Sequence, residues 1–148
     1  MRYILDTNIL LFFVRGKAKG KELKELFDLD NPAIEVFYSI ASWAELFSLV
    51  KQFNWSEKKI DTIEGLLSNF VRIEIDERIA KTYIEIDVYS QGKDKLKPLP
   101  KGVSSRNMGK NDLSIAATAT ILNATLLTTD DDFSHLNGVF INSIQIEH

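Results

Sequence analysis

The sequence has no cysteine and only two histidines, which removes most side chains that bind soft metal ions. Without a thiol there is no disulfide framework and no thiolate metal site. The two imidazoles, of His135 and His148, are too few for the usual zinc sites. Proline and glycine are also scarce, at three and seven residues, so the composition is that of an ordinary globular chain. Any metal ion bound here must be held by oxygen atoms.

Long uncharged apolar runs are absent as well. No run approaches the ~20 residues that a membrane helix needs. The apolar N-terminus is interrupted by Asp6, Thr7 and Asn8 without a small-residue cleavage site, so we expect no signal peptide. A chain of 148 residues with 45% hydrophobic side chains fits one domain, residues 1–148, with a substantial core. We expect a soluble cytoplasmic protein without membrane partners, and its net charge of −3 argues against a general nucleic-acid coat.

Short strand-like segments alternate with longer helix-like segments along the chain. Strands are predicted at residues 3–5, 34–38, 71–75, 125–129 and 139–146. Helices are predicted at residues 9–14, 22–29, 40–53, 57–70, 77–89 and 112–123, with a turn at 16–20 and a turn or short helix at 131–136. The expected helix caps are Thr7 or Asp6 for the first helix, with Thr7 preferred, and Ser39, Ser56, Asp76 and Asn111 for later helices. This order predicts an α/β fold with a mainly parallel sheet of about five strands, covered on both faces.

Two of the predicted strands end in an aspartate. Asp6 follows the strand at 3–5, and Asp130 follows the strand at 125–129. The carboxyl ends of parallel strands share one edge of a sheet, where open α/β sheets bind ligands, so we expect both acids in one crevice. Taken alone, each has a simpler explanation as a helix cap or a solvated acidic turn.

Two further acids stand alone in apolar helices. Glu45 is the single charge between Ser39 and Val50, and Asp112 is the single charge between Asn111 and Thr129. A solvated helix face normally carries several charges, so an isolated acid indicates a site. The simpler explanations are a Glu45 head group that reaches water and a favourable helix-dipole position for Asp112.

Four acids in one crevice require charge compensation. Two carboxylates about 5 Å apart repel by ~3 kcal/mol at an effective dielectric constant of ~20. Either some are protonated or a divalent cation lies among them. Oxygen ligands in an incomplete protein cage suit Mg²⁺ or Mn²⁺, and such sites hydrolyse phosphodiesters by in-line displacement.

Four segments, in this order, resemble the PIN-domain ribonucleases, in particular the VapC-type toxins of bacterial toxin–antitoxin pairs. They are residues 4–8, 42–46, 111–119 and 127–133. The resemblance implies a PIN-like three-layer α/β/α sandwich, Mg²⁺-dependent cleavage of RNA to 5′-phosphate and 3′-hydroxyl products, a cognate antitoxin and a homodimer. By position it implies a catalytic, metal-binding quartet of Asp6, Glu45, Asp112 and Asp130. It also implies Asp132 as an auxiliary metal ligand, and Asn8 and Thr128 as residues that orient ligands.

A basic loop, residues 92–110, lacks any periodicity and is longer than we expect in such toxins. It carries one acid, Asp94, and six cations, so its net charge is +5 and the rest of the chain carries −8. The candidate RNA-binding residues are Lys93, Lys95, Lys97, Lys101, Arg106 and Lys110. They could grip RNA phosphates, the contacts that dominate nucleic-acid affinity. A solvated, mobile loop is the simpler alternative.

Other protein classes also place an aspartate after the first strand. A haloacid-dehalogenase-type phosphohydrolase needs a second aspartate two residues later, where this chain has Asn8. A receiver-type phosphotransfer domain needs a lysine near its last strand, and residues 126–130 contain none. Neither class explains Glu45. These two classes, and a PIN-fold module that binds RNA or protein without cleavage, remain the alternatives.

Overall fold

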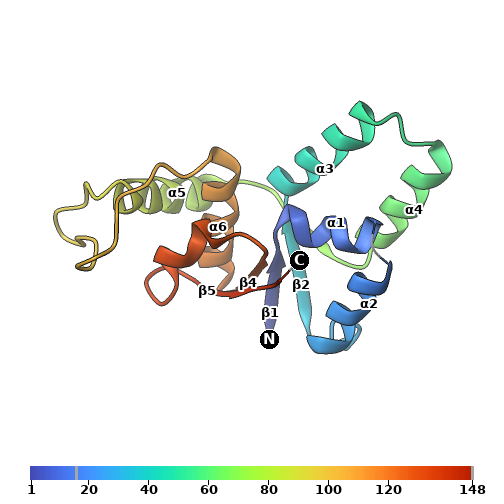
Figure 1. Ribbon diagram of the computed structural model, residues 1–148, viewed down its shortest axis with the longest axis horizontal. Helices are drawn as coiled ribbons and strands as arrows, with labels where there is room; N and C mark the ends of the chain where they lie inside the picture. The colour runs from blue at the N-terminus through green and yellow to red at the C-terminus, as the bar shows by residue number, and fades with distance from the viewer. Residues whose placement is uncertain (16, 148) are drawn as a thin grey trace.

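The computed structural model describes residues 1–15 and 17–147, so Gly16 and His148 lie outside the described residues. Five strands form one parallel sheet in the order β3-β2-β1-β4-β5. The strands are β1 (Arg2–Leu5), β2 (Glu35–Ser39), β3 (Val71–Ile73), β4 (Thr125–Thr128) and β5 (Asn142–Gln145). Helices lie on both sides of this sheet, so the predicted α/β/α sandwich is confirmed (Figure 1).

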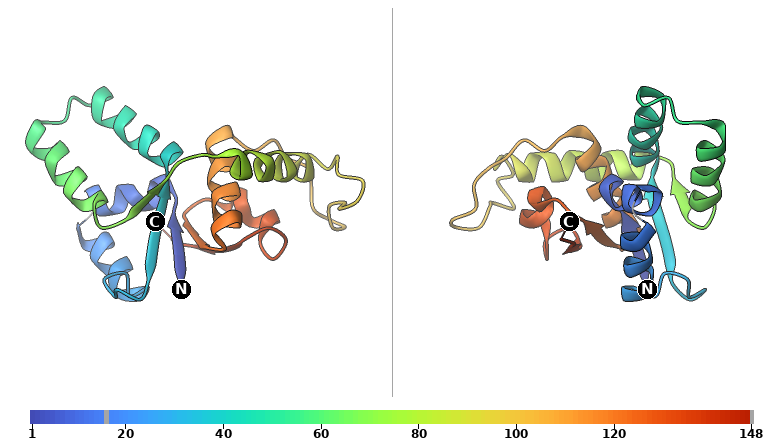
Figure 2. Two further views of the ribbon diagram at one scale, coloured as in Figure 1. Left: turned by 180° about the vertical axis from the view of Figure 1, so that it is seen from behind. Right: turned by 45° about the vertical axis from the view of Figure 1, so that its right-hand side comes forward.

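Alternating side chains of the central strand divide the core in two. Tyr3 and Leu5 belong to one buried cluster, and Ile4 belongs to the other, because successive strand side chains point to opposite faces. The first face is covered by α1 (Thr7–Arg15), α2 (Lys17–Leu26), α3 (Ile40–Gln52) and α4 (Glu57–Leu67). The second is covered by α5 (Glu77–Ser90), α6 (Lys110–Leu122) and the 3₁₀ helix η1 (Asp131–Leu136). Both views of Figure 2 separate these two groups of helices.

The strand order reverses between β1 and β4. From β1 the chain moves outward through β2 to β3, then returns to place β4 on the other side of β1. A reversal of this kind leaves a crevice at the carboxyl ends of the strands. Asp6 directly follows β1, and Asp130 lies two residues beyond the end of β4. The fold therefore brings both strand-end acids to the crevice.

Most predicted helix caps are confirmed, but two are wrong. The side chains of Ser39, Ser56 and Asp76 accept hydrogen bonds from amides of the following helix. Helix α6 instead begins at Lys110 after Gly109, so Asn111 lies inside it. Thr7 also lies inside its helix: the Asp6 carbonyl accepts the first α1 hydrogen bonds, and within the described chain the buried Thr7 hydroxyl has no hydrogen-bond partner.

The turn predicted at 16–20 is also wrong where the structure describes it, because α2 begins at Lys17. Gly20 lies within α2, where an added Cβ would be 3.1 Å from the Cα of Phe13. This glycine permits close packing of α1 and α2 rather than a chain reversal.

The predicted third and last strands are too long, since β3 ends at Ile73 and β5 begins only at Asn142. Among the described helices, none is both long and apolar enough to span a membrane.

Candidate active site

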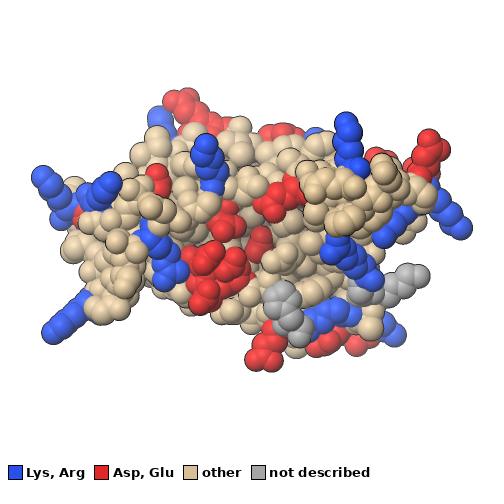
Figure 3. Space-filling view, turned by 45° about the horizontal axis from the view of Figure 1, so that its top comes forward, with Lys and Arg blue, Asp and Glu red and all other residues tan. Residues whose placement is uncertain are grey.

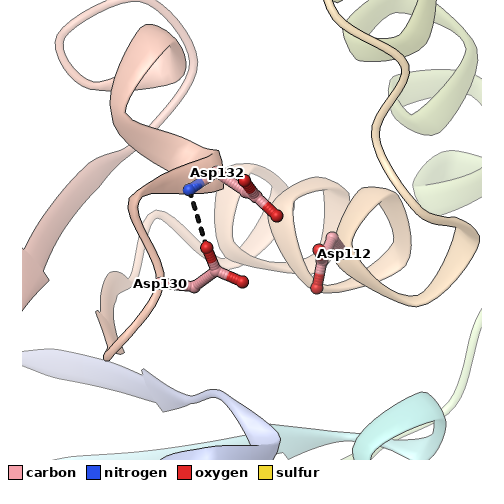
Figure 4. Close-up of side chains that lie close together, drawn as sticks. All are labelled: Asp112, Asp130 and Asp132. Atoms are coloured by element: carbon pink, nitrogen blue, oxygen red, sulfur yellow. Dashed lines mark hydrogen bonds between the residues drawn. The ribbon is translucent and has the colours of Figure 1, made fainter. Parts of the chain in front are cut away.

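Three carboxylates converge where β4, η1 and α6 meet. Asp112, Asp130 and Asp132 each offer an oxygen atom, and these atoms lie within 4.8 Å of one another. Asp112 comes from the first turn of α6, whereas Asp130 follows β4 and Asp132 lies in η1 (Figure 4). The Asp132 amide donates a 2.9 Å hydrogen bond to Oδ1 of Asp130. Asp130 thus caps η1, which fixes the two acids relative to each other.

Asp6 is a buried carboxylate beside this group, with 6% of its surface exposed. Its Oδ2 accepts a 2.6 Å hydrogen bond from the Thr128 hydroxyl, and its Oδ1 accepts one of 2.6 Å from the Thr7 amide. Burial raises the pKa of Asp6, these hydrogen bonds lower it, and the charges of Glu45 and Asp130 raise it further. Asp6 therefore interacts electrostatically with acids from α3 and β4.

Asp112 shows the strongest effect of this concentration of charge. Burial raises the pKa of Asp112 from 3.8 to about 7, together with the negative charges of four nearby acids: Asp6, Asp130, Asp132 and Glu45. Burial and the charge of Asp130 also raise the pKa of Asp132, whereas the charge of Arg106 lowers it. We call Asp6, Glu45, Asp112, Asp130 and Asp132 the acidic cluster; Figure 3 shows acidic side chains gathered centrally on this face.

Glu45 reaches the acidic cluster from α3. Its Oε1 accepts a 2.6 Å hydrogen bond from the side-chain amide of Asn111 on α6. The sequence pattern favours a helix cap at Asn111 and does not predict this contact with Glu45. Its one available signal was an amide next to an isolated acid in an apolar helix.

The two residues proposed to orient ligands differ in their contacts. Thr128 donates to Asp6 and accepts a 3.0 Å hydrogen bond from the amide of Asp130, so it contacts two acids of the cluster. The Asn8 amide instead donates to the Thr129 hydroxyl at 3.1 Å. The structure therefore places Thr128 within the acidic cluster and Asn8 against the end of β4.

The basic loop joins α5 to α6 and extends away from the sheet (Figure 1). Its five lysines are exposed: Lys93, Lys95, Lys97, Lys101 and Lys110. Lys97 lies over the ring of Phe140 at 4.6 Å. Arg106 is half-buried, and its guanidinium donates a 3.3 Å hydrogen bond to the carbonyl oxygen of Asp132. Of the proposed RNA-binding cations, Arg106 is thus the one bonded to a residue of the acidic cluster in the described part of the chain.

The donor set fits a hard divalent cation. Within residues 1–15 and 17–147, no lysine or arginine forms an ion pair with a member of the acidic cluster. The carboxylates are therefore close together without a direct ion pair, and Arg106, bonded to the Asp132 carbonyl, is a positive charge beside them. Mg²⁺ and Mn²⁺ prefer oxygen ligands, and Mg²⁺ usually keeps some of its coordination positions for water or substrate phosphate.

Comparison with known proteins supports the fold and the family. The PIN domain family matches residues 3–139. VapBC2 from Rickettsia felis, solved with a promoter DNA fragment, is 21% identical, with a TM-score of 0.74 over 99% of this chain and 100% of that chain. VapBC-1 from nontypeable Haemophilus influenzae is 26% identical, with a TM-score of 0.70 over 98% of each chain.

A third similar structure is VapBC-5 from Mycobacterium tuberculosis, a member of the VapBC family of toxin–antitoxin systems. It is 20% identical, with a TM-score of 0.61 over 98% of each chain. No curated protein matches significantly. Because the family match spans nearly the whole sheet and every acid of the cluster, this chain belongs to the PIN domain family.

Proposed function

We propose that this protein is a metal-dependent endoribonuclease. The observation that carries the proposal is the convergence of Asp112, Asp130 and Asp132 within 4.8 Å, beside buried Asp6, with no ion pair to a lysine or arginine among the described residues. The proposed catalytic, metal-binding residues are Asp6, Glu45, Asp112 and Asp130, with Asp132 as an auxiliary ligand. Bound Mg²⁺, or Mn²⁺ in its place, would supply Lewis acidity toward an RNA phosphodiester.

The surrounding residues hold the acids in place for this chemistry. Thr128 restrains Asp6, and Asn111 restrains Glu45, each through a 2.6 Å hydrogen bond. The pKa of Asp112, raised to about 7, means that its proton leaves readily at neutral pH when a cation binds. Arg106 adds positive charge beside Asp132, where it could orient a phosphate of the substrate.

We further propose that the protein is the toxin of a toxin–antitoxin pair, that a cognate antitoxin binds it and that it forms a homodimer. The similarity to VapBC structures supports the antitoxin. Induction of the chain alone should arrest growth of a bacterial host, and co-expression of the adjacent small gene should restore growth. Light scattering of the purified chain tests the dimer, which a monomer at all concentrations would exclude.

The nuclease proposal is tested with purified protein and single-stranded RNA, with Mg²⁺ or with EDTA. Asp130→Asn keeps an oxygen that can cap η1 but removes a charge of the acidic cluster. Asp131→Asn is the matched control, since it removes the charge of the adjacent exposed residue, which lies outside the cluster. We expect Mg²⁺-dependent cleavage by the wild type and by Asp131→Asn, with 5′-phosphate products, and loss of cleavage in Asp130→Asn.

Cleavage in EDTA at the wild-type rate, or full activity of a folded Asp130→Asn variant, would contradict this assignment. RNA binding without cleavage by the wild type, at any Mg²⁺ or Mn²⁺ concentration, would indicate the non-catalytic alternative instead.

A further inference from the structure

A largely buried group of four side chains links the end of α5, the end of the basic loop and η1. It consists of Ser90, Arg106, Met108 and His135, which we call the clamp. Ser90 is fully buried, and Met108 and His135 are each 9% exposed. Ser90 and His135 have no role in the chemistry proposed above.

The hydrogen bonds of the clamp form a closed path. Nε2 of His135 lies 2.7 Å from the hydroxyl of Ser90, which also contacts the sulfur of Met108 at 3.4 Å. The backbone carbonyl of Ser90 accepts a 2.7 Å hydrogen bond from the amide of Arg106. The guanidinium of Arg106 then returns to the carbonyl of Asp132, one turn before His135 in η1. Two connections from Ser90 therefore reach η1, one through His135 and one through Arg106.

Packing alone does not explain a histidine at position 135. Its ring stacks on Tyr89, with centroids 6.4 Å apart and planes 7° apart, and its buried Nδ1 has no hydrogen-bond partner among the residues that the structure describes. Burial, with a further contribution from the charge of Arg106, lowers its pKa to about 4 although an interaction with the Asp132 backbone raises it, so the imidazole is neutral at pH 7. An unpaired buried polar atom is unfavourable. An apolar side chain would fill this space without that cost but could not bond to Ser90.

The clamp also distinguishes Arg106 from the other cations of the basic loop. The five lysines are exposed, whereas Arg106 is half-buried, and both its backbone amide and its guanidinium are bonded. Ordering a long arginine side chain at the end of an irregular loop costs conformational entropy, which the contacts of that side chain must offset. Two contacts restrain Arg106: its backbone bond to Ser90, and its guanidinium bond to the Asp132 carbonyl in η1, whose position is held by the bond between His135 and the Ser90 hydroxyl.

We propose that His135 and Ser90 are positioning residues that hold Arg106 and Asp132 in a fixed relation beside the acidic cluster. This inference rests on the proposed function. Asp132 is then pre-aligned to bind a divalent cation, and Arg106 is pre-aligned to contact one phosphate of the RNA. Loss of the clamp should weaken both interactions while the remaining acids stay in place.

The test compares Ser90→Ala, His135→Leu and His135→Gln, whose amide nitrogen can replace Nε2. Thr118→Val is the control, because it also removes a buried hydroxyl, one that bonds at 2.7 Å within its own helix. Calorimetry measures Mn²⁺ affinity with the metal alone. The salt dependence of binding to a short single-stranded RNA in EDTA counts the phosphate contacts.

We expect Ser90→Ala and His135→Leu to weaken Mn²⁺ binding several-fold. In the same two variants, the magnitude of the negative slope of log affinity against log salt should decrease by about 0.7, the value of one phosphate contact on a single strand. His135→Gln should restore both quantities toward wild type. Thr118→Val should lower Tm but change neither.

Wild-type Mn²⁺ affinity and an unchanged salt slope in folded Ser90→Ala would overturn the inference, and this small substitution decides even if His135→Leu does not fold. A wild-type protein that binds no Mn²⁺ would instead contradict the proposed function. The RNA salt slopes would then decide the inference, with an unchanged slope in Ser90→Ala against it.

Discussion

The hydroxyl of Thr128 donates a 2.6 Å hydrogen bond to Asp6 and accepts one of 3.0 Å from the amide of Asp130. A single side chain at the end of β4 thereby connects the acids that follow the two central, adjacent strands. The connection lies where the strand order reverses, so the geometry of the sheet and the arrangement of the acids depend on each other.

Thr128→Val should destabilise the protein and disturb the acidic cluster. Valine keeps the shape of threonine but leaves an oxygen of buried Asp6 without its donor, which costs about 1–3 kcal/mol of unfolding free energy. Denaturant unfolding of Thr128→Val, beside Thr125→Val at the partly exposed start of the same strand, measures this cost. Equal losses in the two variants would show that the Asp6 contact adds nothing.

Without metal, stability should fall as pH rises toward 8. The pKa of Asp112 is about 7 in the folded state against 3.8 as its ordinary value. Between these values the folded state holds a proton that the unfolded state has released, so its contribution is complete below about pH 3.8 and lost as pH rises through about 7. Tm in EDTA should therefore decline less in Asp112→Asn than in wild type. Parallel Tm curves for the two proteins would contradict the shift.

The titration of His135 changes stability with pH in the direction opposite to that of Asp112. Its pKa is lowered to about 4, so its contribution to stability is lost as pH falls from about 6.5 toward 4. Since His135 is present in both proteins, its effect cancels when the Tm difference between wild type and Asp112→Asn is followed against pH.

Mg²⁺ should raise Tm, and more strongly at about pH 8 than at about pH 5. A cation that binds only the folded state stabilises it by about 2.7 kcal/mol at a hundred times its Kd. At low pH it must displace the proton that Asp112 retains, which weakens binding. Calorimetric scans with and without Mg²⁺ measure the rise, and Asp6→Asn should lose most of it and also lose RNA cleavage. A rise that is the same at both pH values, or unaltered in Asp6→Asn, would argue against a cation at these acids.

The exposed lysines of the basic loop should contribute to RNA affinity but not to metal affinity. Lys93, Lys95 and Lys101 have no contact with the acidic cluster among the described hydrogen bonds and ion pairs, so they act through charge alone. In a triple alanine variant, the magnitude of the salt slope of RNA binding should decrease by up to about 2, at roughly 0.7 per phosphate contact.

The matched control changes three exposed lysines elsewhere, Lys21, Lys51 and Lys58, so that net charge falls equally. If both triple variants bind RNA with the same affinity and slope, the loop has no specific role in substrate binding.

The sequence by itself determined the order of strands and helices, most helix caps and the PIN family. These properties depend on near neighbours: strand periodicity spans a few residues, and Ser39, Ser56 and Asp76 each bond to an amide two or three residues later. It also singled out the acids as candidates, because isolated charges in apolar segments are visible without coordinates. The predictions of a turn at Gly20 and a helix cap at Asn111 were wrong, because each of these residues makes its contact with another helix.

Only the tertiary structure decided which polar groups meet. Asn111 bonds to Glu45 across 66 positions, Arg106 to Asp132 across 26 and His135 to Ser90 across 45. No periodicity or capping rule extends over such separations. These contacts follow from the reversal of strand order and from the packing of α3, α5, α6 and η1, which bring distant segments to one edge of the sheet.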